Sequence, residues 1–210
     1  MEIFCLLEKL IYKMFTGIVE EIGKIKKIKE NDLVIECKKV IEGSNIGDSI
    51  SVSGICLTIT SITDNSLHFQ LTEETKSKTF FGFEFGIEKS TVNLERAASY
   101  DKRIGGHLLE GHIEGIAVCK KINVLKNSNE VIFETDKNII DNIVEKGYIG
   151  IDGTSITIVS IDNNQFAISL IPHTMNITTL GHLSKNQIVN IETDINARYI
   201  RKYVEQIMKN

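Results

Sequence analysis

The chain contains no tryptophan, only one proline and no apolar run long enough to span a bilayer. A transmembrane helix needs about 18 or more consecutive apolar residues, so no membrane segment is expected. The formal net charge of −4 also means that the basic excess typical of nucleic-acid-binding proteins is missing. We therefore expect neither a membrane nor a nucleic acid as a partner.

Spacings typical of metal sites are missing as well. The chain has four cysteines: Cys5, Cys37, Cys56 and Cys119. Their spacing fits no zinc motif, and His107 and His112 are five residues apart, which is not a helical metal pair. We expect no metal, no disulfide set and a cytoplasmic protein with reduced thiols.

What the chain does have is an internal repeat. Residues 54–82 align without a gap on residues 153–181, and ten of the 29 pairs are identical. Residues 17–20 and 92–95 of the first copy match 111–114 and 189–192 of the second. A period of almost a hundred residues is too long for a solenoid unit and indicates a duplicated small domain. Two similar domains predict two similar binding sites.

Each copy shows the alternation of polar and apolar residues that is typical of β-strands, with turn residues at short intervals. A small antiparallel barrel of about six strands fits each copy. A short helix is expected at residues 139–144, before Gly147. Ile200, Val204, Ile207 and Met208 predict a C-terminal helix capped by Asp194 or Asn196. This helix packs either on its own barrel or on copies of itself.

Small polar residues alternate along one strand of each copy. Cys56 and Thr58 face the same side of their strand, as do Ser155 and Thr157. Because an unpaired buried hydroxyl is unfavourable, these residues indicate a polar pocket. Hydroxyls bonded to neighbouring backbone are the alternative.

Two further segments suggest ligand contacts. Residues 70–75 and 169–174 each end a strand and could present an extended backbone rim to a flat heterocycle. Pro172 is expected to fix the second of these turns. A histidine near a pocket could serve proton transfer, although a structural role is the ordinary one for a lone histidine.

Four motifs together resemble the α-type riboflavin synthase family: residues 14–20, 93–97, 105–112 and 147–157. The resemblance covers residues 14 to about 204. It implies an all-β fold of two six-stranded antiparallel Greek-key barrels in tandem, plus a C-terminal α-helix, in a homotrimer. It also implies that two molecules of 6,7-dimethyl-8-ribityllumazine exchange a four-carbon unit without a cofactor, giving riboflavin and 5-amino-6-(D-ribitylamino)uracil. Association with lumazine synthase is a further partner that the family suggests.

The expected domains are an extension outside the family pattern (1–13), two barrels (14–106 and 107–196) and an oligomerisation helix (197–210). Either Met1 or Met14 could be the start. By position, the resemblance assigns twelve residues to the first pocket: Gly17, Ile18, Val19, Cys56, Leu57, Thr58, Gln70, Leu71, Thr72, Glu73, Glu74 and Thr75. It assigns thirteen to the second: Gly111, His112, Ile113, Lys146, Ser155, Ile156, Thr157, Ser169, Leu170, Ile171, Pro172, His173 and Thr174. The family has Asn where Ser53 stands, so an altered turn contact is expected there.

The two pockets differ, as a reaction between two identical substrates requires. His112 is the first candidate for general acid–base catalysis. The candidates for positioning or activating the attacking group are Ser155, Thr157 and Cys56, and those for tuning charge are Lys146 and Asp194. A non-catalytic lumazine protein that carries a bound fluorophore is the alternative function. A flavin-reductase barrel would need a nicotinamide domain for which the chain is too short.

Overall fold

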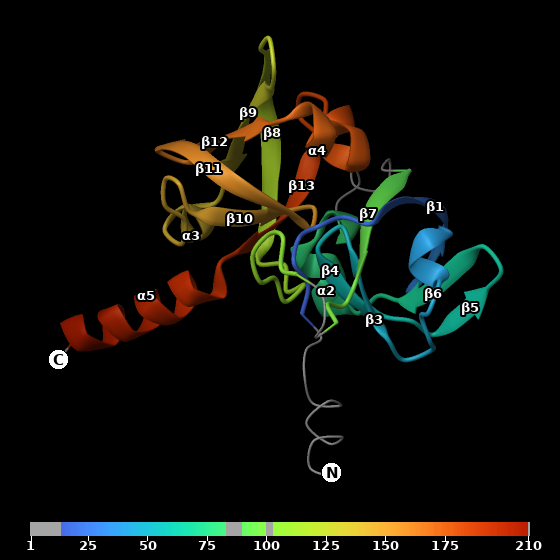
Figure 1. Ribbon diagram of the computed structural model, residues 1–210. Helices are drawn as coiled ribbons and strands as arrows, with labels where there is room; N and C mark the ends of the chain where they lie inside the picture. Colours follow the sequence, from blue (N-terminus) through green and yellow to red (C-terminus); the bar gives the residue numbers. More distant parts are fainter. Residues whose placement is uncertain (1–13, 83–89, 100–102, 210) are drawn as a thin grey trace.

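The computed structural model describes residues 14–82, 90–99 and 103–209. The two halves of the chain form two β-units that pack together, and the last helix extends away from them (Figure 1). The proposed extension at 1–13 lies outside the described residues.

The first half is a curled antiparallel sheet with short helices. Its strands follow the order β4-β3-β7-β1-β2-β6-β5. The strands are β1 (Glu21–Lys29), β2 (Asp32–Glu36), β3 (Ser49–Val52), β4 (Ile55–Thr58), β5 (Ser61–Thr63), β6 (Ser66–Gln70) and β7 (Thr91–Arg96). The helices are η1 (Lys39–Ile41), α2 (Glu73–Lys78) and η2 (Phe80–Gly82).

The second half is a closed antiparallel barrel in the order β10-β11-β12-β9-β8-β13. Its strands are β8 (Gly115–Val124), β9 (Asn129–Thr135), β10 (Tyr148–Ile151), β11 (Thr154–Asp162), β12 (Gln165–Leu170) and β13 (Ile188–Thr193). Its helices are α3 (Lys137–Ile140), α4 (Pro172–Ile177) and η4 (Thr179–His182), and α5 (Ile195–Met208) follows β13. The short helix predicted at residues 139–144 corresponds to α3, which begins two residues earlier and ends at Ile140.

The two sheets have the same strand order. They differ at one place, where one strand is interrupted. Strand β11 shifts register between Ile158 and Ser160. At the equivalent place the first half breaks its strand into β4 and β5, where the backbone N–H of Thr60 donates to the carbonyl of His68 at 2.9 Å. The prediction of six strands therefore holds for the second half. The described part of the first half has seven strands, because the break at this place divides one strand into β4 and β5.

Each half has its own apolar core, but the first core also takes side chains from the second half. In the barrel, Phe133 stacks on Phe166 with ring centroids 5.4 Å apart. The first core includes the buried Ile188 of β13, and Ile113 and Ile116 pack against it. Burial of apolar surface thus stabilises the contact between the halves as well as each half alone.

Two buried asparagines at equivalent positions bind the halves together. Asn93 of β7 donates through Nδ2 to the carbonyl of Asp152 at 2.9 Å and accepts from the backbone N–H of Thr179 at 2.8 Å. Asn190 of β13 donates to the carbonyl of Ser53 at 2.9 Å and accepts from the N–H of Phe80 at 2.9 Å. The contacts are reciprocal, so the halves are related by an approximate two-fold axis.

The turn at Ser53 keeps its contact to the neighbouring strand. Ser53 has a positive φ of 45°, and its Oγ accepts from the backbone N–H of Asn93 at 3.1 Å. Its counterpart Asp152 (φ 46°) accepts from the N–H of Asn190 at 2.8 Å. The serine thus bonds to the same strand position as the aspartate does in the other copy.

The expected extended rims are helical instead. After Gln70 the chain enters α2, and Thr72 caps this helix by accepting from the N–H of Thr75 at 3.1 Å. In the second half Pro172 lies in the first turn of α4, where its missing N–H leaves no hydrogen bond unmade. Pro172 fixes the turn as predicted, but residues 73–75 and 172–174 are helix starts and not an extended edge.

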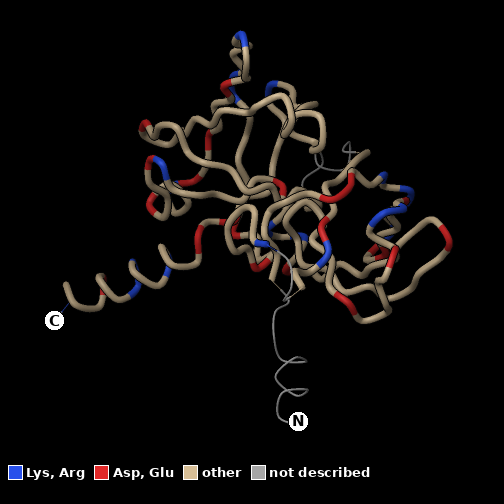
Figure 2. The backbone as a smooth tube through the Cα atoms, viewed as in Figure 1, with Lys and Arg blue, Asp and Glu red and all other residues tan. Residues whose placement is uncertain are grey.

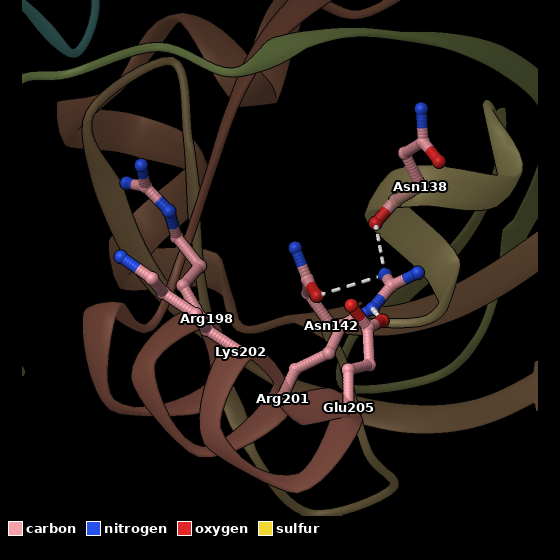
Figure 3. A pocket seen from close by; sticks show the side chains of 6 residues that line it. All are labelled: Asn138, Asn142, Arg198, Arg201, Lys202 and Glu205. Atoms are coloured by element: carbon pink, nitrogen blue, oxygen red, sulfur yellow. Dashed lines mark hydrogen bonds and ion pairs between the residues drawn. The ribbon is translucent and has the colours of Figure 1, made fainter. Parts of the chain in front are cut away.

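Helix α5 begins as predicted, since Asp194 caps it by accepting from the N–H of Asn196 at 2.9 Å. Its polar face borders a cleft of about 310 Å³ beside α3 (Figure 3). There Arg201 donates to Asn142 at 3.1 Å and to Glu205 at 2.9 Å. No α5 side chain is buried. The helix contacts its own barrel through this polar face, and its apolar stripe does not pack there.

The opposite face of α5 is apolar and exposed. It carries Tyr199, Ile200, Tyr203, Val204, Ile207 and Met208. Among the residues that the structure describes, no helix has the length and apolar character needed to cross a membrane. Lys and Arg (blue) and Asp and Glu (red) are both spread over the two halves (Figure 2).

Candidate functional site

The strands β4 and β11 present their small polar residues on the outside of the sheets. Cys56 and Ser155 are half-buried, while Thr58 and Thr157 are exposed. Leu57 and Ile156, between them, point into the cores. The prediction that the polar residues share a face is confirmed, and this face is the outer wall of each sheet.

A glycine loop from the first half covers Ser155. The backbone N–H of Ser155 donates to the carbonyl of Gly17 at 2.9 Å. Gly17 has a φ of +73°, and a Cβ there would lie 2.5 Å from the backbone nitrogen of Ser155. Only glycine fits this position, because any side chain would both strain the backbone and push the loop off Ser155.

The reciprocal loop covers Cys56. The N–H of Cys56 donates to the carbonyl of Gly111 at 2.9 Å, and Gly111 has a φ of +75° with its Cβ position 2.6 Å from the Cβ of Cys56. Each glycine loop therefore completes the polar face of the other repeat.

This crossing corrects the expected grouping of the pockets. The loop with Gly17 and Ile18 belongs with Ser155, and the loop with Gly111 and His112 belongs with Cys56. The error arose because pairing by sequence position joined each loop to its own repeat, whereas the approximate two-fold axis joins it to the other. His112 and Ser155, expected in one pocket, lie at different sites.

Two buried carboxylates hold the glycine loops. Glu95 of β7 accepts from the N–H and the hydroxyl of Thr16 at 2.7 and 2.8 Å, and from the N–H of Gly17 at 3.0 Å. Glu192 of β13 accepts from the N–H groups of Glu110 and Gly111 at 2.6 and 3.0 Å. Burial raises the pKa of Glu95 and of Glu192 to about 7, against the pull of these donors.

Sequence reasoning missed these two carboxylates, although both occupy the same place in the repeat. It also missed the role of His107. The Nδ1 atom of His107 lies 2.6 Å from the Oγ of Ser155, and burial lowers the pKa of this imidazole. A lone histidine gives no spacing signal, so only the fold shows this pair.

The remaining catalytic candidates lie at the surface. The side chain of His112 is 66% exposed, with Nδ1 3.3 Å from Oε2 of Glu110. Lys146 has a φ of 65°, and its Nζ reaches the carbonyl of Val159 at 3.5 Å. Asp194 is half-buried as the cap of α5 and lies near enough to His107 to oppose the lowering of its pKa.

The other expected contacts divide by burial. Val19, Leu71 and Leu170 are buried in the cores, so they can offer a ligand only backbone atoms. The half-buried side chains are Ile113, Thr75 and Thr174. The exposed ones are Ile18, Gln70, Thr72, Glu73, Glu74, Ser169, Ile171, Pro172 and His173. Because β12 runs antiparallel to β11, the segment that starts α4 lies towards the Ser155 end of β11.

Within the described ranges, no three His, Cys, Asp or Glu side chains are placed to hold a metal ion. Cys37 and Cys119 are free thiols. Backbone amides, hydroxyls and an imidazole are thus what the two faces offer. Such groups suit a flat, neutral molecule with carbonyl and ring-nitrogen acceptors.

A family model described as the lumazine binding domain matches the chain twice, over residues 16–97 and 110–194. Two such domains, in which the glycine loop of each covers the polar face of the other, define a protein of the lumazine-binding class. Two solved structures of LumP are similar. LumP complexed with riboflavin has a TM-score of 0.77 at 31% identity, covering 86% of this chain and 99% of that chain. LumP complexed with 6,7-dimethyl-8-(1'-D-ribityl) lumazine has a TM-score of 0.75 at 30% identity, with the same coverage.

Curated relatives named riboflavin synthase match nearly the whole chain. The protein of Actinobacillus pleuropneumoniae is 40% identical over 195 residues, which cover 91% of this chain and 90% of that protein. The protein of Escherichia coli (strain K12) is 37% identical over 202 residues, with 93% of each covered. That of Bacillus subtilis (strain 168) is 36% identical over 201 residues, covering 94% and 93%. The chain belongs to the riboflavin synthase family and is a transferase.

Proposed function

We propose that the protein converts two molecules of 6,7-dimethyl-8-ribityllumazine into riboflavin and 5-amino-6-(D-ribitylamino)uracil. One molecule donates a four-carbon unit and the other accepts it, so the atoms balance without an oxidant, a reductant or a cofactor. The proposal rests on the family of the chain and on its duplicated site.

One observation carries the proposal: the chain holds two equivalent polar faces with unlike groups. Cys56 and the loop carrying His112 make one face, and Ser155 and the loop carrying Ile18 make the other. One substrate must lose a proton from a methyl group and the other must accept a nucleophile. Two identical sites would treat both substrates alike, whereas these two can hold them in different states.

The residues divide between these tasks. The exposed imidazole of His112, beside Glu110, is placed to take or give a proton at the surface of the Cys56 face. Ser155 and Thr157 offer hydroxyls on the other face. Cys56, Lys146 and Asp194 remain the candidates for positioning a reacting group and tuning charge. Holding two flat rings in contact supplies much of the rate, because it removes the entropic cost of their encounter.

We propose that sites from different chains meet in an oligomer. We propose a homotrimer in which the exposed apolar face of α5 packs on sister helices, since a stripe of this size is seldom left in water. We propose a cytoplasmic location, which the free thiols of Cys37 and Cys119 support. A complex with lumazine synthase stays a proposal drawn from the family.

A second candidate is a non-catalytic lumazine carrier. The observation in its favour is that the similar solved structures are of LumP with bound ligands. A carrier needs one site of high affinity, so groups in the second face would serve no purpose. Retention of polar groups at Cys56 and at Ser155 favours the enzyme.

Turnover separates the two functions. The purified full chain is incubated with 6,7-dimethyl-8-ribityllumazine, and the formation of riboflavin is followed by its fluorescence and by chromatography. The enzyme forms one riboflavin for every two substrate molecules consumed. A carrier binds the lumazine and returns it unchanged. Glu30→Gln, a substitution at an exposed turn between β1 and β2, serves as a surface control and should leave turnover unchanged.

A further inference from the structure

His107 is held rigidly against Ser155. Its side chain is buried, at 8% exposure, and its ring stacks on that of Tyr148 with centroids 5.1 Å apart and planes 14° apart. Gly106 precedes it, and a Cβ at Gly106 would lie 2.1 Å from the carbonyl oxygen of Thr16. The loop can therefore approach closely enough to place Nδ1 of His107 at 2.6 Å from Oγ of Ser155.

The surroundings of the second ring nitrogen identify the tautomer. Nε2 of His107 is buried and has no hydrogen-bond partner among the described residues. Burial disfavours the charged imidazolium, so one nitrogen carries the proton. A proton on Nε2 would leave a buried N–H unsatisfied, and such orphaned donors are rarer than under-satisfied acceptors. The proton therefore belongs on Nδ1, where it is donated to Ser155.

This tautomer fixes what the Ser155 hydroxyl can do. A hydroxyl has one proton and two lone pairs, and the Nδ1–H of His107 occupies one lone pair. The Ser155 proton then points away from the imidazole, so His107 cannot act as the base that removes it. Ser155 is thereby set as a donor towards an acceptor atom outside the sheet.

We propose that His107 is a positioning residue that sets Ser155 as a hydrogen-bond donor to a carbonyl oxygen or ring nitrogen of the bound lumazine, and not as a nucleophile. This inference rests on the proposed function. A donor aimed at the heterocycle stabilises negative charge that develops there when a methyl proton leaves or a nucleophile adds. Cys56 stands at the equivalent position of the other face, and a thiol is a weaker donor. Negative charge on the lumazine beside Ser155 would thus be stabilised more than negative charge on the lumazine beside Cys56.

The tautomer can be read directly in the wild-type full chain. Long-range ¹H–¹⁵N correlation spectra of ¹⁵N-labelled protein distinguish protonated from bare imidazole nitrogens. The His107 signals are assigned by their absence in His107→Phe. We expect a protonated Nδ1 and a bare Nε2. A protonated Nε2 would overturn the proposal, and this result does not depend on any variant being active.

Kinetics test the positioning itself. His107→Phe keeps a ring against Tyr148 but removes both nitrogens, and should lower kcat by about ten- to a hundredfold, somewhat less than loss of a whole oxyanion donor. Its Kd for riboflavin should change by less than about threefold, because the flat contacts remain. His107→Asn places an amide N–H near the position of Nδ1 and should restore part of kcat. His68→Phe on β6 is the matched control and should behave as wild type.

Coupling to Ser155 distinguishes positioning from packing. In a Ser155→Ala background, His107→Phe should lower kcat by less than a further factor of about three, because the hydroxyl it orients is gone. Independent, multiplied effects would show that His107 only packs, as would full kcat in His107→Phe. If wild type binds riboflavin and shows the Nδ1–H tautomer but makes no riboflavin, the proposed function fails while the positioning of Ser155 stands.

Discussion

At the scale of single residues, Lys146 allows an unusually clean test of a side chain. It adopts a φ of 65°, and its counterpart in the first half is Gly47, with a φ of 95°. A non-glycine residue is strained in this region by about 1 to 2 kcal/mol. Substitution by glycine relieves this strain, but it also raises the conformational entropy of the unfolded chain, and the two effects on stability oppose each other. Lys146→Gly therefore removes the side chain without harming the backbone.

We expect Lys146→Gly to melt within a few degrees of wild type, because the stability change is within about 1 kcal/mol. Turnover should fall to that of Lys146→Ala, since both lack the ammonium group. The measurements are thermal unfolding and steady-state riboflavin formation. Unchanged turnover in both variants would leave Lys146 a surface residue without a part in the site.

His112 and Ser155 should respond differently to truncation. The side chain of His112 is largely exposed, so His112→Ala should change stability by less than about 0.5 kcal/mol while lowering turnover. Ser155→Ala leaves Nδ1 of His107 without its acceptor and should lose about 1 to 3 kcal/mol as well as turnover. Urea unfolding beside the fluorescence assay measures both. If His112→Ala unfolds far more easily yet keeps full activity, His112 is structural.

At the scale of elements, the glycine loops test the crossing of the halves. Gly17→Ala should lower stability by about 2 to 5 kcal/mol, because backbone strain and a steric clash add, and it should disrupt the face of Ser155. Gly111→Ala should disrupt the face of Cys56. Riboflavin titrations followed by fluorescence quenching are expected to show one site lost in each variant.

A matched control separates strain from closure of the site. Gly43 has a φ of +76°, yet a Cβ there would meet nothing within 4 Å. Gly43→Ala should therefore show the strain alone, with both riboflavin sites retained. The crossing is contradicted if Gly17→Ala keeps both sites and loses no more stability than this control.

The carboxylates on β7 and β13 predict a pH dependence of stability. Their folded pKa of about 7 lies above the ordinary value of 4.5. Between these values the native state holds protons that the unfolded state has released, so the stability due to these groups falls as the pH rises from about 4.5 to 7. Above that window their contribution is level.

The double variant Glu95→Gln and Glu192→Gln should lose this slope. Between about pH 5 and 7.5, the free energy of unfolding of wild type should fall by at least about 2 kcal/mol more than that of the variant. Urea unfolding at a series of pH values measures it. Glu73→Gln, an exposed change on α2, should keep the wild-type slope. Parallel curves for wild type and the double variant would contradict the prediction.

The sequence predicted those elements that depend on local pattern. The repeat and the alternation around Cys56 and Ser155 indicated two similar β-units, and Asp194 marked the start of α5. The crossing could not be predicted, because either assignment of the Gly17 loop satisfies the same sequence pattern. The short helix α4 was missed although Pro172 at its first turn was a signal. Glu95, Glu192 and His107 acquire their roles only through burial.

At the scale of the whole molecule, α5 should organise the oligomer. Truncation after Asn196 removes the exposed apolar face, so we expect single chains that still bind riboflavin but turn over poorly, because sites of different chains no longer meet. Light scattering and the fluorescence assay measure both. Ile200→Ser should weaken association in the same direction, whereas Gln206→Ser, a polar change on the same helix, should not. A monomer with normal activity would show that each chain closes its own site.

The reciprocal glycine loops bear on the origin of the chain. Neither repeat carries a complete polar face, since Gly17 covers Ser155 and Gly111 covers Cys56. An ancestral polypeptide of one repeat would thus have worked only as a symmetric pair with two equal sites. After fusion of two such genes, each site could change separately. Cys56 could then replace a serine in one repeat while Ser155 stayed in the other. Division of labour between the sites would then be a product of that fusion.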